Sequence, residues 1–302
     1  KDLIFSYGER LSTYIISQLL FKEGINSLYL PSDRLIVTDD NFGKSLPLLR
    51  ESERKIKQEL VNSLRSKRIS ICVTGFFGVT LDQKIATFGR GGSDLTAAVL
   101  AYSLRNDFKC KVIYWKDVNG FLNADPAFVE KASLIRNISY IEAKELAFFG
   151  SKILHPLCLD VSEKGSITSE IRSFQDPDSN DFTTITKEIL DKENKVKAIT
   201  FIYKLTMVTL ESDTMVPLPG TASKLFSLLG ENNINLVFIS QSSSENNITF
   251  GFDFEDTYLV GKLLRDSEFF GKKWFKIKMD SQISLVAVIG PGLLYTPGIA
   301  GK

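Results

Sequence analysis

The fold is decided by residues 83–106, which read QKIATFGRGGSDLTAAVLAYSLRN. We expect a short strand, a glycine-rich loop at 89–92, and an alanine- and leucine-rich helix opened by Ser93 and Asp94. The glycines permit backbone angles that other residues avoid and leave no Cβ atom in the path of a ligand. The helix start offers unpaired N–H groups, and Arg90 adds a guanidinium suited to a carboxylate or phosphate. The stretch therefore predicts an anion site.

Two nucleotide-binding motifs nearly fit this region and fail. The Rossmann spacing G-x-G-x-x-G would need glycine where Asp94 stands. The Walker spacing that ends at residues 43–45 would need glycine where Thr38 stands. Taken alone, residues 89–94 are equally consistent with a tight strand-to-helix turn in which Ser93 or Asp94 is the N-cap.

Composition narrows the function classes. The 302-residue chain carries 37 basic and 36 acidic side chains, so it has no electrostatic footprint for nucleic acid. Cys72, Cys110 and Cys158 lack disulfide or zinc spacing and are interpreted as buried reduced thiols; with one histidine, no metal site is expected. No apolar run reaches the length of a membrane span, and no signal peptide is visible. We expect a cytoplasmic protein of about two domains, without nucleic-acid or membrane partners.

Strands and helices alternate along the first half of the chain. Apolar, β-branched runs at 69–74 and 110–115 are typical of buried parallel strands. An apolar stripe follows Ser6–Ser12 in a helix that ends at Gly24. The stripe consists of Leu11, Ile15, Ile16, Leu19 and Leu20. This alternation implies a mainly parallel sheet covered on both faces, with ligands bound beyond the carboxyl ends of its strands.

Three loops follow the predicted strands and should open at one edge of the sheet. They span residues 75–78, 89–94 and 116–126. This geometry places five polar side chains around one crevice. They are Arg90, Ser93, Asp94, Lys116 and Asp117.

Five blocks of sequence stand in the order found in aspartate kinases, and the chain resembles that family. The blocks are Ser6–Ser12, VTGFFG at 73–78, TFGRGGSD at 87–94, Trp115–Pro126 and Tyr140–Pro156. The resemblance implies an α/β, amino-acid-kinase-like sandwich with a mainly parallel central sheet, followed by α+β ACT (ferredoxin-like) regulatory domains. It also implies transfer of the ATP γ-phosphoryl group to the β-carboxylate of L-aspartate. This reaction gives 4-phospho-L-aspartate, in the first step of lysine, threonine and methionine biosynthesis.

The resemblance assigns roles to the crevice. The implied substrate-binding residues are Glu9, Arg90, Gly91, Gly92 and Ser93. Glu9 stands where the family meets the ammonium group of aspartate, and Arg90 and Ser93 correspond to the clamp on its carboxylate. Asp94 corresponds to the carboxylate that organises the catalytic groups, so Asp94 and Arg90 are the implied catalytic residues.

A further set is implied for ATP. It comprises Lys116, Asp117, Leu122, Ala127 and Lys152. The family usually has tyrosine at the position of Leu122 and often arginine at that of Ala127. Mg²⁺ is expected to accompany ATP, and binding mostly through phosphates and water would leave little ligand motif in the protein. His155 precedes a proline and is interpreted as a packed structural histidine.

Both ends of the chain are interpreted as incomplete. The family opens with a Lys-Phe-Gly-Gly-Thr-Ser segment that supplies a catalytic lysine, and these residues contain no such segment. Residues 297–302 stop inside what resembles a helix start. We therefore expect the chain alone to be inactive and the activity to belong to its parent protein.

The pattern changes beyond a charged linker at residues 191–197. Strand and helix signals then follow a β-α-β-β-α order that resembles an ACT domain, and Val208–Ala222 weakly repeats in Val286–Ala300. The predicted domains are a kinase domain at 1–194, a first ACT domain at 195–280 and the start of a second at 281–302.

In the family, tandem ACT domains carry amino-acid feedback control. ISQSSSE at 239–245 resembles their Gln-x-Ser-Ser-Glu turn, which makes Asn235 and Gln241 the effector candidates for lysine or threonine. The alternative is that Asn235 and the serines only shape turns. Because ACT sheets usually pair side by side, the resemblance implies a homodimer or a higher homo-oligomer.

Two alternative functions stay open. One is a bifunctional aspartate kinase fused to homoserine dehydrogenase, which a G-x-G-x-x-G after a strand beyond residue 302 would favour. The other is a catalytically silent, amino-acid-binding regulatory subunit. Absence of the Lys-Phe-Gly-Gly-Thr-Ser segment from the full gene product would favour it, as do the residues at Leu122 and Ala127.

Overall fold

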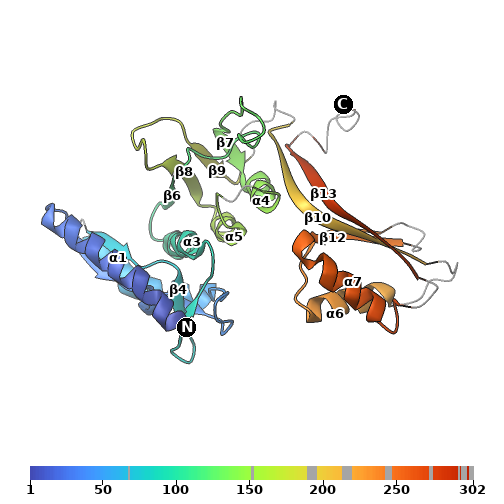
Figure 1. The fold of residues 1–302 in the computed structure, drawn as a ribbon. Helices are drawn as coiled ribbons and strands as arrows, with labels where there is room; N and C mark the ends of the chain where they lie inside the picture. Colours follow the sequence, from blue (N-terminus) through green and yellow to red (C-terminus); the bar gives the residue numbers. More distant parts are fainter. Residues whose placement is uncertain are drawn as a thin grey trace. The chain divides into compact units, whose positions relative to one another are not determined.

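The computed structural model describes residues 1–66, 69–150, 153–188, 196–212, 220–241, 247–271, 275–291, 293 and 298. The chain divides into two compact units, residues 1–200 with 288–302, and residues 201–287 (Figure 1). Each unit has its own hydrophobic core. The predicted combination of an α/β first unit with an α+β second unit is confirmed.

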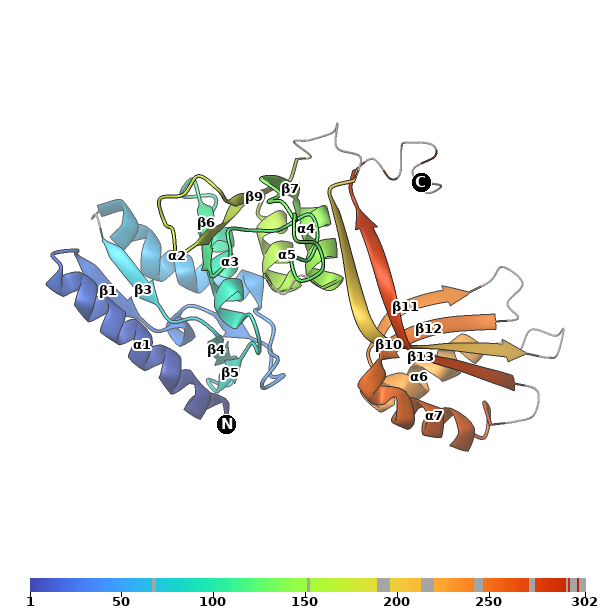
Figure 2. The ribbon, with the colours of Figure 1, turned by 45° about the horizontal axis from the view of Figure 1, so that its top comes forward.

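The first unit opens with a long helix that lies along two parallel strands. Its first elements are α1 (Asp2–Lys22), β1 (Ser27–Leu30), the 3-10 turn η1 (Ser32–Arg34), β2 (Val37–Thr38), α2 (Leu49–Ser66) and β3 (Ser70–Val73). β1 pairs with β3 in parallel, and α1 contacts both strands (Figure 2). The strand predicted at 69–74 is confirmed, although its side chains are half-buried rather than enclosed on both faces.

The apolar stripe of α1 differs from expectation. Leu11, Ile15, Ile16 and Leu19 are 50–61% exposed, whereas Ser6 and Ser17 are buried. The helix itself is confirmed, but it packs on the sheet through small polar residues. Ser6 Oγ donates to the carbonyl of Leu3, and Ser17 Oγ lies 3.3 Å from Ser27 Oγ at the start of β1. The stripe is therefore a surface of this unit.

A second small sheet carries the glycine loop. It consists of β2, β4 (Phe77–Thr80) and β5 (Ile85–Thr87), and α3 (Gly92–Leu104) follows. β4 pairs with β2 in parallel but with β5 in antiparallel fashion. The prediction that residues 75–78 form a loop is only half right, because β4 begins at Phe77. The polar turn before Ile85 simply closes a β-hairpin.

The rest of the first unit is a four-stranded sheet with helices. Its elements are β6 (Lys111–Lys116), β7 (Asn137–Ser139), α4 (Tyr140–Phe148), α5 (Pro156–Lys164), β8 (Thr168–Ser173) and β9 (Thr183–Thr186). The strand order is β6-β8-β9-β7, with parallel pairing at both ends and an antiparallel pair in the middle. A single core joins α2, α3, α5 and this sheet, and Ile56, Val99, Leu159 and Ile171 are fully buried in it.

The second unit is a four-stranded antiparallel sheet with helices on one face (Figure 2). Its elements are β10 (Ala198–Ser212), α6 (Thr221–Glu231), β11 (Leu236–Gln241), β12 (Asn247–Asp253), η2 (Phe254–Asp256), α7 (Thr257–Asp266) and β13 (Phe275–Ile289). The strand order is β11-β12-β10-β13, which leaves β11 and β13 at the edges. Val208, Leu225, Phe250 and Val260 are fully buried between sheet and helices.

The long strands β10 and β13 each contain one residue in the left-handed region, Lys204 and Gln282, with φ of 61° and 60°. Pairing of β10 with β12 begins immediately after this point, at Leu205. The predicted boundary after residue 194 falls outside the described residues, as do residues 292, 294–297, 299 and 300 of the second copy of the internal repeat. Residues 281–289 form the end of β13, and their assignment to a second ACT domain stays a prediction.

Candidate functional site

The glycine loop between β5 and α3 forms the centre of the candidate site. Gly89 and Gly91 adopt φ angles of 78° and 75°, which residues with a Cβ atom rarely adopt. Gly91 is the N-cap of α3, and its carbonyl accepts the amide of Leu95. The alternative that Ser93 or Asp94 caps the helix is therefore wrong, because both lie in the first turn. In that turn the unpaired amides and the positive end of the helix dipole favour an anion.

The loop before β4 packs directly against this helix start. A Cβ atom on Gly75 would lie 2.5 Å from Ser93 Oγ, and one on Gly92 would lie 3.0 Å from Phe76 Cα. Thr96 Oγ1 accepts the amide of Phe76 at 3.2 Å and donates to the carbonyl of Gly92 at 3.0 Å. The two loops therefore meet, as the sequence predicted, and both glycines are explained by the close approach.

An ion pair joins the third loop to the site. Lys116, the last residue of β6, donates to both carboxylate oxygens of Asp94, over Nζ–Oδ1 and Nζ–Oδ2 distances of 2.9 and 2.8 Å. The side chains of Lys116 and Asp94 are 24% and 16% exposed. Partial burial weakens solvent screening of the pair. The structure thus fixes an ammonium group beside the first turn of α3, where the sequence predicted that the loops at 89–94 and 116–126 would meet.

A buried thiol lies close to this ion pair. Burial raises the pKa of Cys158 to about 12, and the carboxylate of Asp94 acts in the same direction. Its Sγ donates to the carbonyl of His155 at 2.9 Å. The thiol therefore stays protonated at neutral pH and is no nucleophile. The prediction of a buried thiol is confirmed for Cys158, whereas Cys72 and Cys110 are half-buried.

Three further predicted side chains are available to a ligand. Arg90 and Ser93 are exposed beside the ion pair, and Asp117 is exposed directly after Lys116. None of the three side chains has a hydrogen bond or an ion pair with another described residue. A guanidinium, a hydroxyl and a carboxylate therefore stand unengaged around a fixed ammonium group.

The predicted nucleotide loop is anchored to the sheet at Gly120. Thr183 Oγ1 accepts the amide of Phe121 at 2.9 Å and donates to the carbonyl of Ile135 at 2.7 Å. A Cβ atom on Gly120 would collide with that hydroxyl, and φ is 153°. Sequence reasoning missed Thr183, because nothing in its local sequence marks the contact.

The remaining nucleotide candidates lie further along the chain. Leu122 is half-buried and forms an isolated bridge with Leu134. Ala127 is exposed in a turn, where its amide donates to Asp125 Oδ1 at 2.8 Å. Lys152 lies outside the described residues. A nucleotide-binding role for these residues stays a prediction.

Glu9 lies in the middle of α1, because the helix begins at Asp2. Its neighbour Arg10 forms an ion pair with Asp33, with Nη2 and Oδ2 3.1 Å apart, and its guanidinium lies 4.7 Å from the centre of the Phe77 ring. These contacts tie α1 to the start of β4. The carboxylate of Glu9 has no hydrogen bond or ion pair with another described residue, so its role also stays a prediction.

His155 supports the glycine loop from the opposite side. It is the N-cap of α5, and its Nδ1 accepts the amide of Leu157 at 3.2 Å. A Cβ atom on Gly91 would lie 2.6 Å from the Cβ atom of His155. The interpretation of His155 as a packed, hydrogen-bonded histidine is confirmed. Its position against the glycine loop was not apparent, because the two residues are distant in the sequence.

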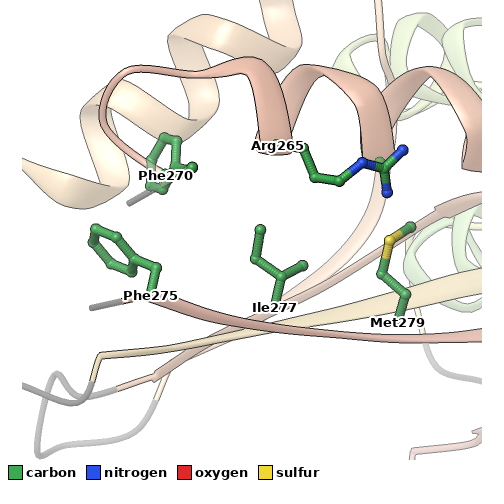
Figure 3. Close-up of a pocket in the computed structure, with 7 residues that line it drawn as sticks. Arg265, Phe270, Phe275, Ile277 and Met279 are labelled. Atoms are coloured by element: carbon green, nitrogen blue, oxygen red, sulfur yellow. The ribbon is translucent and has the colours of Figure 1, made fainter. Parts of the chain in front are cut away.

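The second unit contains a cavity of about 540 Å³ between α7 and β13. Figure 3 shows Phe275, Ile277 and Met279 projecting from β13 toward α7, with Phe270 at one end and Arg265 on the helix. The lining combines these four apolar side chains with the guanidinium of Arg265 and the backbone of two glycines.

Neither effector candidate lines that cavity. Asn235 precedes β11 and Gln241 ends it, and both are exposed. At about 3.3 Å per residue, roughly 20 Å separate the two positions, a span that a single amino acid does not cover within one chain. The serines after Gln241 lie outside the described residues.

The described residues contain neither a cluster of metal ligands nor a helix that could span a membrane. No three His, Cys, Asp or Glu side chains gather as a metal site in this part of the chain. Asp94 is already engaged by Lys116, so a Mg²⁺ ion that accompanied ATP would take most of its ligands from phosphates and water. No helix in the described ranges is long and apolar enough to cross a membrane.

Comparison with known protein families agrees with this division of the chain. Residues 1–173 match the amino acid kinase family, and residues 208–266 match the ACT domain.

Comparison with individual proteins points the same way. The chain is 30% identical over 308 residues to aspartokinase 2 of Bacillus subtilis, covering 100% of this chain and 71% of that protein. It is also 30% identical over 314 residues to the bifunctional aspartokinase/homoserine dehydrogenase of Buchnera aphidicola, covering 100% of this chain and 36% of that protein. The chain therefore spans about a third of the bifunctional relative.

Solved structures of similar proteins share the fold. Escherichia coli aspartokinase III in complex with aspartate and ADP has a TM-score of 0.81 and 28% identity, over 99% of this chain and 65% of that chain. The same enzyme in complex with lysine and aspartate has a TM-score of 0.76 and 29% identity, over 96% of this chain and 63% of that chain.

Proposed function

Because the chain belongs to the amino acid kinase family, and within it to the aspartokinases, we propose that the protein phosphorylates the β-carboxylate of L-aspartate with ATP. The observation that carries the proposal is the Lys116–Asp94 ion pair at the first turn of α3. It places a fixed cation beside an anion-binding helix start and beside the exposed Arg90. That arrangement suits a reaction between two anions.

The chemistry needs positioning and charge neutralisation more than a covalent catalyst. A β-carboxylate oxygen attacks the γ-phosphorus of ATP, the bond to the β,γ-bridging oxygen breaks, and ADP leaves with the electron pair. Arg90 and Ser93, with the amides of the α3 N-terminus, hold the anionic substrate. Asp94 holds the ammonium of Lys116 in place, and that ammonium offsets charge on the phosphates. Mg²⁺ bound to ATP would supply further neutralisation.

The nucleotide is assigned to the loop that follows Lys116. Asp117 is exposed at its start, and Gly120 is locked against Thr183, so the loop has a defined path. A preorganised loop lowers the entropy cost of binding ATP. Leu122 in place of the family's usual tyrosine offers an apolar contact without a hydroxyl, which predicts that the protein discriminates weakly among nucleotide bases.

Feedback control is assigned to the second unit, which matches the ACT domain. Escherichia coli aspartokinase III has been solved with lysine, and lysine or threonine is the effector we propose here. β11 is an edge strand, so a second copy can pair with it in antiparallel fashion. Asn235 of one copy would then lie near Gln241 of the other, which resolves the separation of the two candidates within one chain. A homodimer or larger oligomer is therefore proposed.

One alternative has a specific observation in its favour. The relative from Buchnera aphidicola is bifunctional, and the chain matches 36% of its length. Homoserine dehydrogenase activity in the full-length product would place the protein with such enzymes. It would leave the kinase assignment unchanged.

The test is a trapping assay on the full-length protein with ATP, Mg²⁺ and hydroxylamine. Aspartyl hydroxamate and ADP should form with L-aspartate and not with L-glutamate, and lysine or threonine should suppress both products. A folded protein that binds lysine or threonine yet forms neither product would contradict the proposal and favour a regulatory subunit.

A further inference from the structure

A buried ion pair fixes the beginning of β10 inside the first unit. Lys197 Nζ lies 3.2 Å from Glu142 Oε2, and the two side chains are only 4% and 6% exposed. The sequence placed Lys197 in a charged linker, but it is a buried residue. A buried charge is retained only with a partner, so this pair constrains where the chain leaves the first unit.

Glu142, the acidic partner of Lys197, also stabilises the start of α4. Glu142 Oε2 accepts the amide and the hydroxyl of Ser139, at 2.8 and 2.7 Å, and the Ser139 side chain accepts the amide of Glu142. This capping box fixes the start of α4. Lys197 Nζ also donates to the carbonyl of Asn137, at 3.4 Å, in the strand just before α4. Glu142 Oε1 is buried without a hydrogen-bond partner among the described residues. The carboxylate therefore depends on Lys197 for its charge balance.

Of the residues beside Lys197, one binds the predicted nucleotide loop and another binds the C-terminal end of α4. The amide of Ile199 donates to the carbonyl of Asn123 at 2.9 Å. Thr200 Oγ1 donates to the carbonyl of Phe149, which ends α4, at 3.0 Å. A polar cavity of about 420 Å³ separates the Asn123 turn from Lys197, so little side-chain packing supports the loop there. The loop is thus attached to the β10 start through the Ile199–Asn123 hydrogen bond, and Asn123 is otherwise paired with Ser133.

We propose that Lys197 is a positioning residue for ATP, acting through the Lys197–Glu142 pair and the Ile199–Asn123 hydrogen bond on the loop that follows Asp117. The pair sets the place of the β10 start, and the Ile199–Asn123 hydrogen bond carries that constraint to the end of the loop that Thr183 leaves free, since Thr183 holds the loop at Gly120 and Phe121. β10 then continues into the regulatory unit, so the same segment is the route by which that unit alters nucleotide affinity. The proposal rests on the proposed kinase function and deepens its regulation.

The test compares Lys197→Met with Lys144→Met in the full-length protein. Lys144 is a matched control, because it lies on α4 and pairs with Asp160 and Glu163 in a partly exposed position. Lys197→Met should raise KM for ATP about tenfold while KM for aspartate changes less than twofold. Hydrogen–deuterium exchange should become at least tenfold faster in residues 120–126 and 197–201. Lys144→Met should change none of these quantities.

A second variant keeps the test valid if Lys197→Met folds poorly. Glu142→Gln combined with Lys197→Met removes the unpaired buried charge while the glutamine still completes the capping box. This double variant should fold and keep the raised KM for ATP. Faster exchange confined to residues 137–149, with nucleotide affinity unchanged, would overturn the proposal.

The readouts separate this proposal from the kinase assignment. If no variant turned over aspartate, titration with a fluorescent ADP analogue would still measure nucleotide affinity. Weaker binding of the analogue by Lys197→Met, with faster exchange in residues 120–126, would support the positioning role alone. Equal binding by Lys197→Met and Lys144→Met would contradict it.

Discussion

Gly91 and His155 stand so close that a Cβ atom on the glycine would lie 2.6 Å from the Cβ atom of the histidine. Gly91 also has a φ of 75° and caps α3, while His155 caps α5. One contact therefore joins the N-terminal ends of two helices at the candidate site. The glycine loop is fixed by its own backbone and by a residue from a distant part of the chain.

Gly91→Ala should destabilise the protein by about 2–5 kcal/mol. A left-handed conformation costs a non-glycine residue roughly 1–2 kcal/mol, and overpacking against His155 adds roughly 1–3 kcal/mol. Urea unfolding followed by circular dichroism measures the change. Gly8→Ala is the control, since nothing lies within 4 Å of a Cβ atom there and the residue is helical. Equal stability of the two variants would contradict the packing described for Gly91.

Lys116→Met should lower kcat/KM for ATP about 10²-fold, because it removes a fixed cation from the site of phosphoryl transfer. Steady-state kinetics on the full-length protein measure the effect. Lys111→Met is the control on the same strand, where the lysine pairs with Glu170 and is 46% exposed. A loss no larger for Lys116→Met than for Lys111→Met would remove Lys116 from the site.

Cys158 should make the protein less stable at alkaline pH. Burial, followed by the nearby Asp94 carboxylate, raises its pKa to about 12 in the folded state. The stabilising contribution is complete below the unfolded pKa of roughly 8.5 and is lost as the pH rises from there toward 12. The loss by pH 10 is on the order of 2 kcal/mol.

Unfolding titrations at pH 8 and pH 10 measure this effect, and Cys158→Ser should reduce the difference between them. Iodoacetamide should modify the half-buried Cys72 well before Cys158 in the native protein. Rapid native-state alkylation of Cys158 would show that its thiol is accessible and ionised.

Gly261→Ala should stabilise the second unit by about 0.5–1 kcal/mol through its higher helix propensity. A Cβ atom there would lie 3.2 Å from Arg265 Nη1 and 3.5 Å from Met279 Sδ, both at the ends of flexible side chains beside the cavity in Figure 3. Thermal unfolding measures the shift. Gly251→Ala should instead destabilise the second unit, because its Cβ atom would collide with the Phe238 ring. Destabilisation by Gly261→Ala would mean that the cavity is more tightly packed than described.

The sequence predicted individual helices and strands, and it predicted that the three loops meet. Both follow from the types of neighbouring residues and from their spacing along the chain. The glycine loop, the helix after it and the strand ending at Lys116 all formed as expected. The three loops meet at the start of α3, where Gly75 packs against Ser93 and Lys116 pairs with Asp94, although the strands before them, β3, β5 and β6, belong to three separate sheets. The family resemblance found the same residues by a separate route.

Contacts between distant segments could not be predicted. Nothing near Thr183 signals its hydroxyl bonds to Phe121 and Ile135. Lys197 sits in a charged stretch, and charged stretches are usually solvated, yet its side chain is buried. The amphipathic pattern of α1 was correctly identified as helical, but periodicity does not say which neighbour covers the apolar face.

The most direct test of the central claim is the kinetics of aspartate phosphorylation by Arg90→Ala and Asp94→Asn in the full-length protein. Arg90→Ala should raise KM for aspartate at least tenfold, because it removes the cation that we propose holds the substrate carboxylate. Asp94→Asn should lower kcat about 10²–10³-fold, because the ammonium of Lys116 loses its fixed position. Full activity in both variants, or no aspartate-dependent ADP release by a folded wild-type protein, would contradict the account.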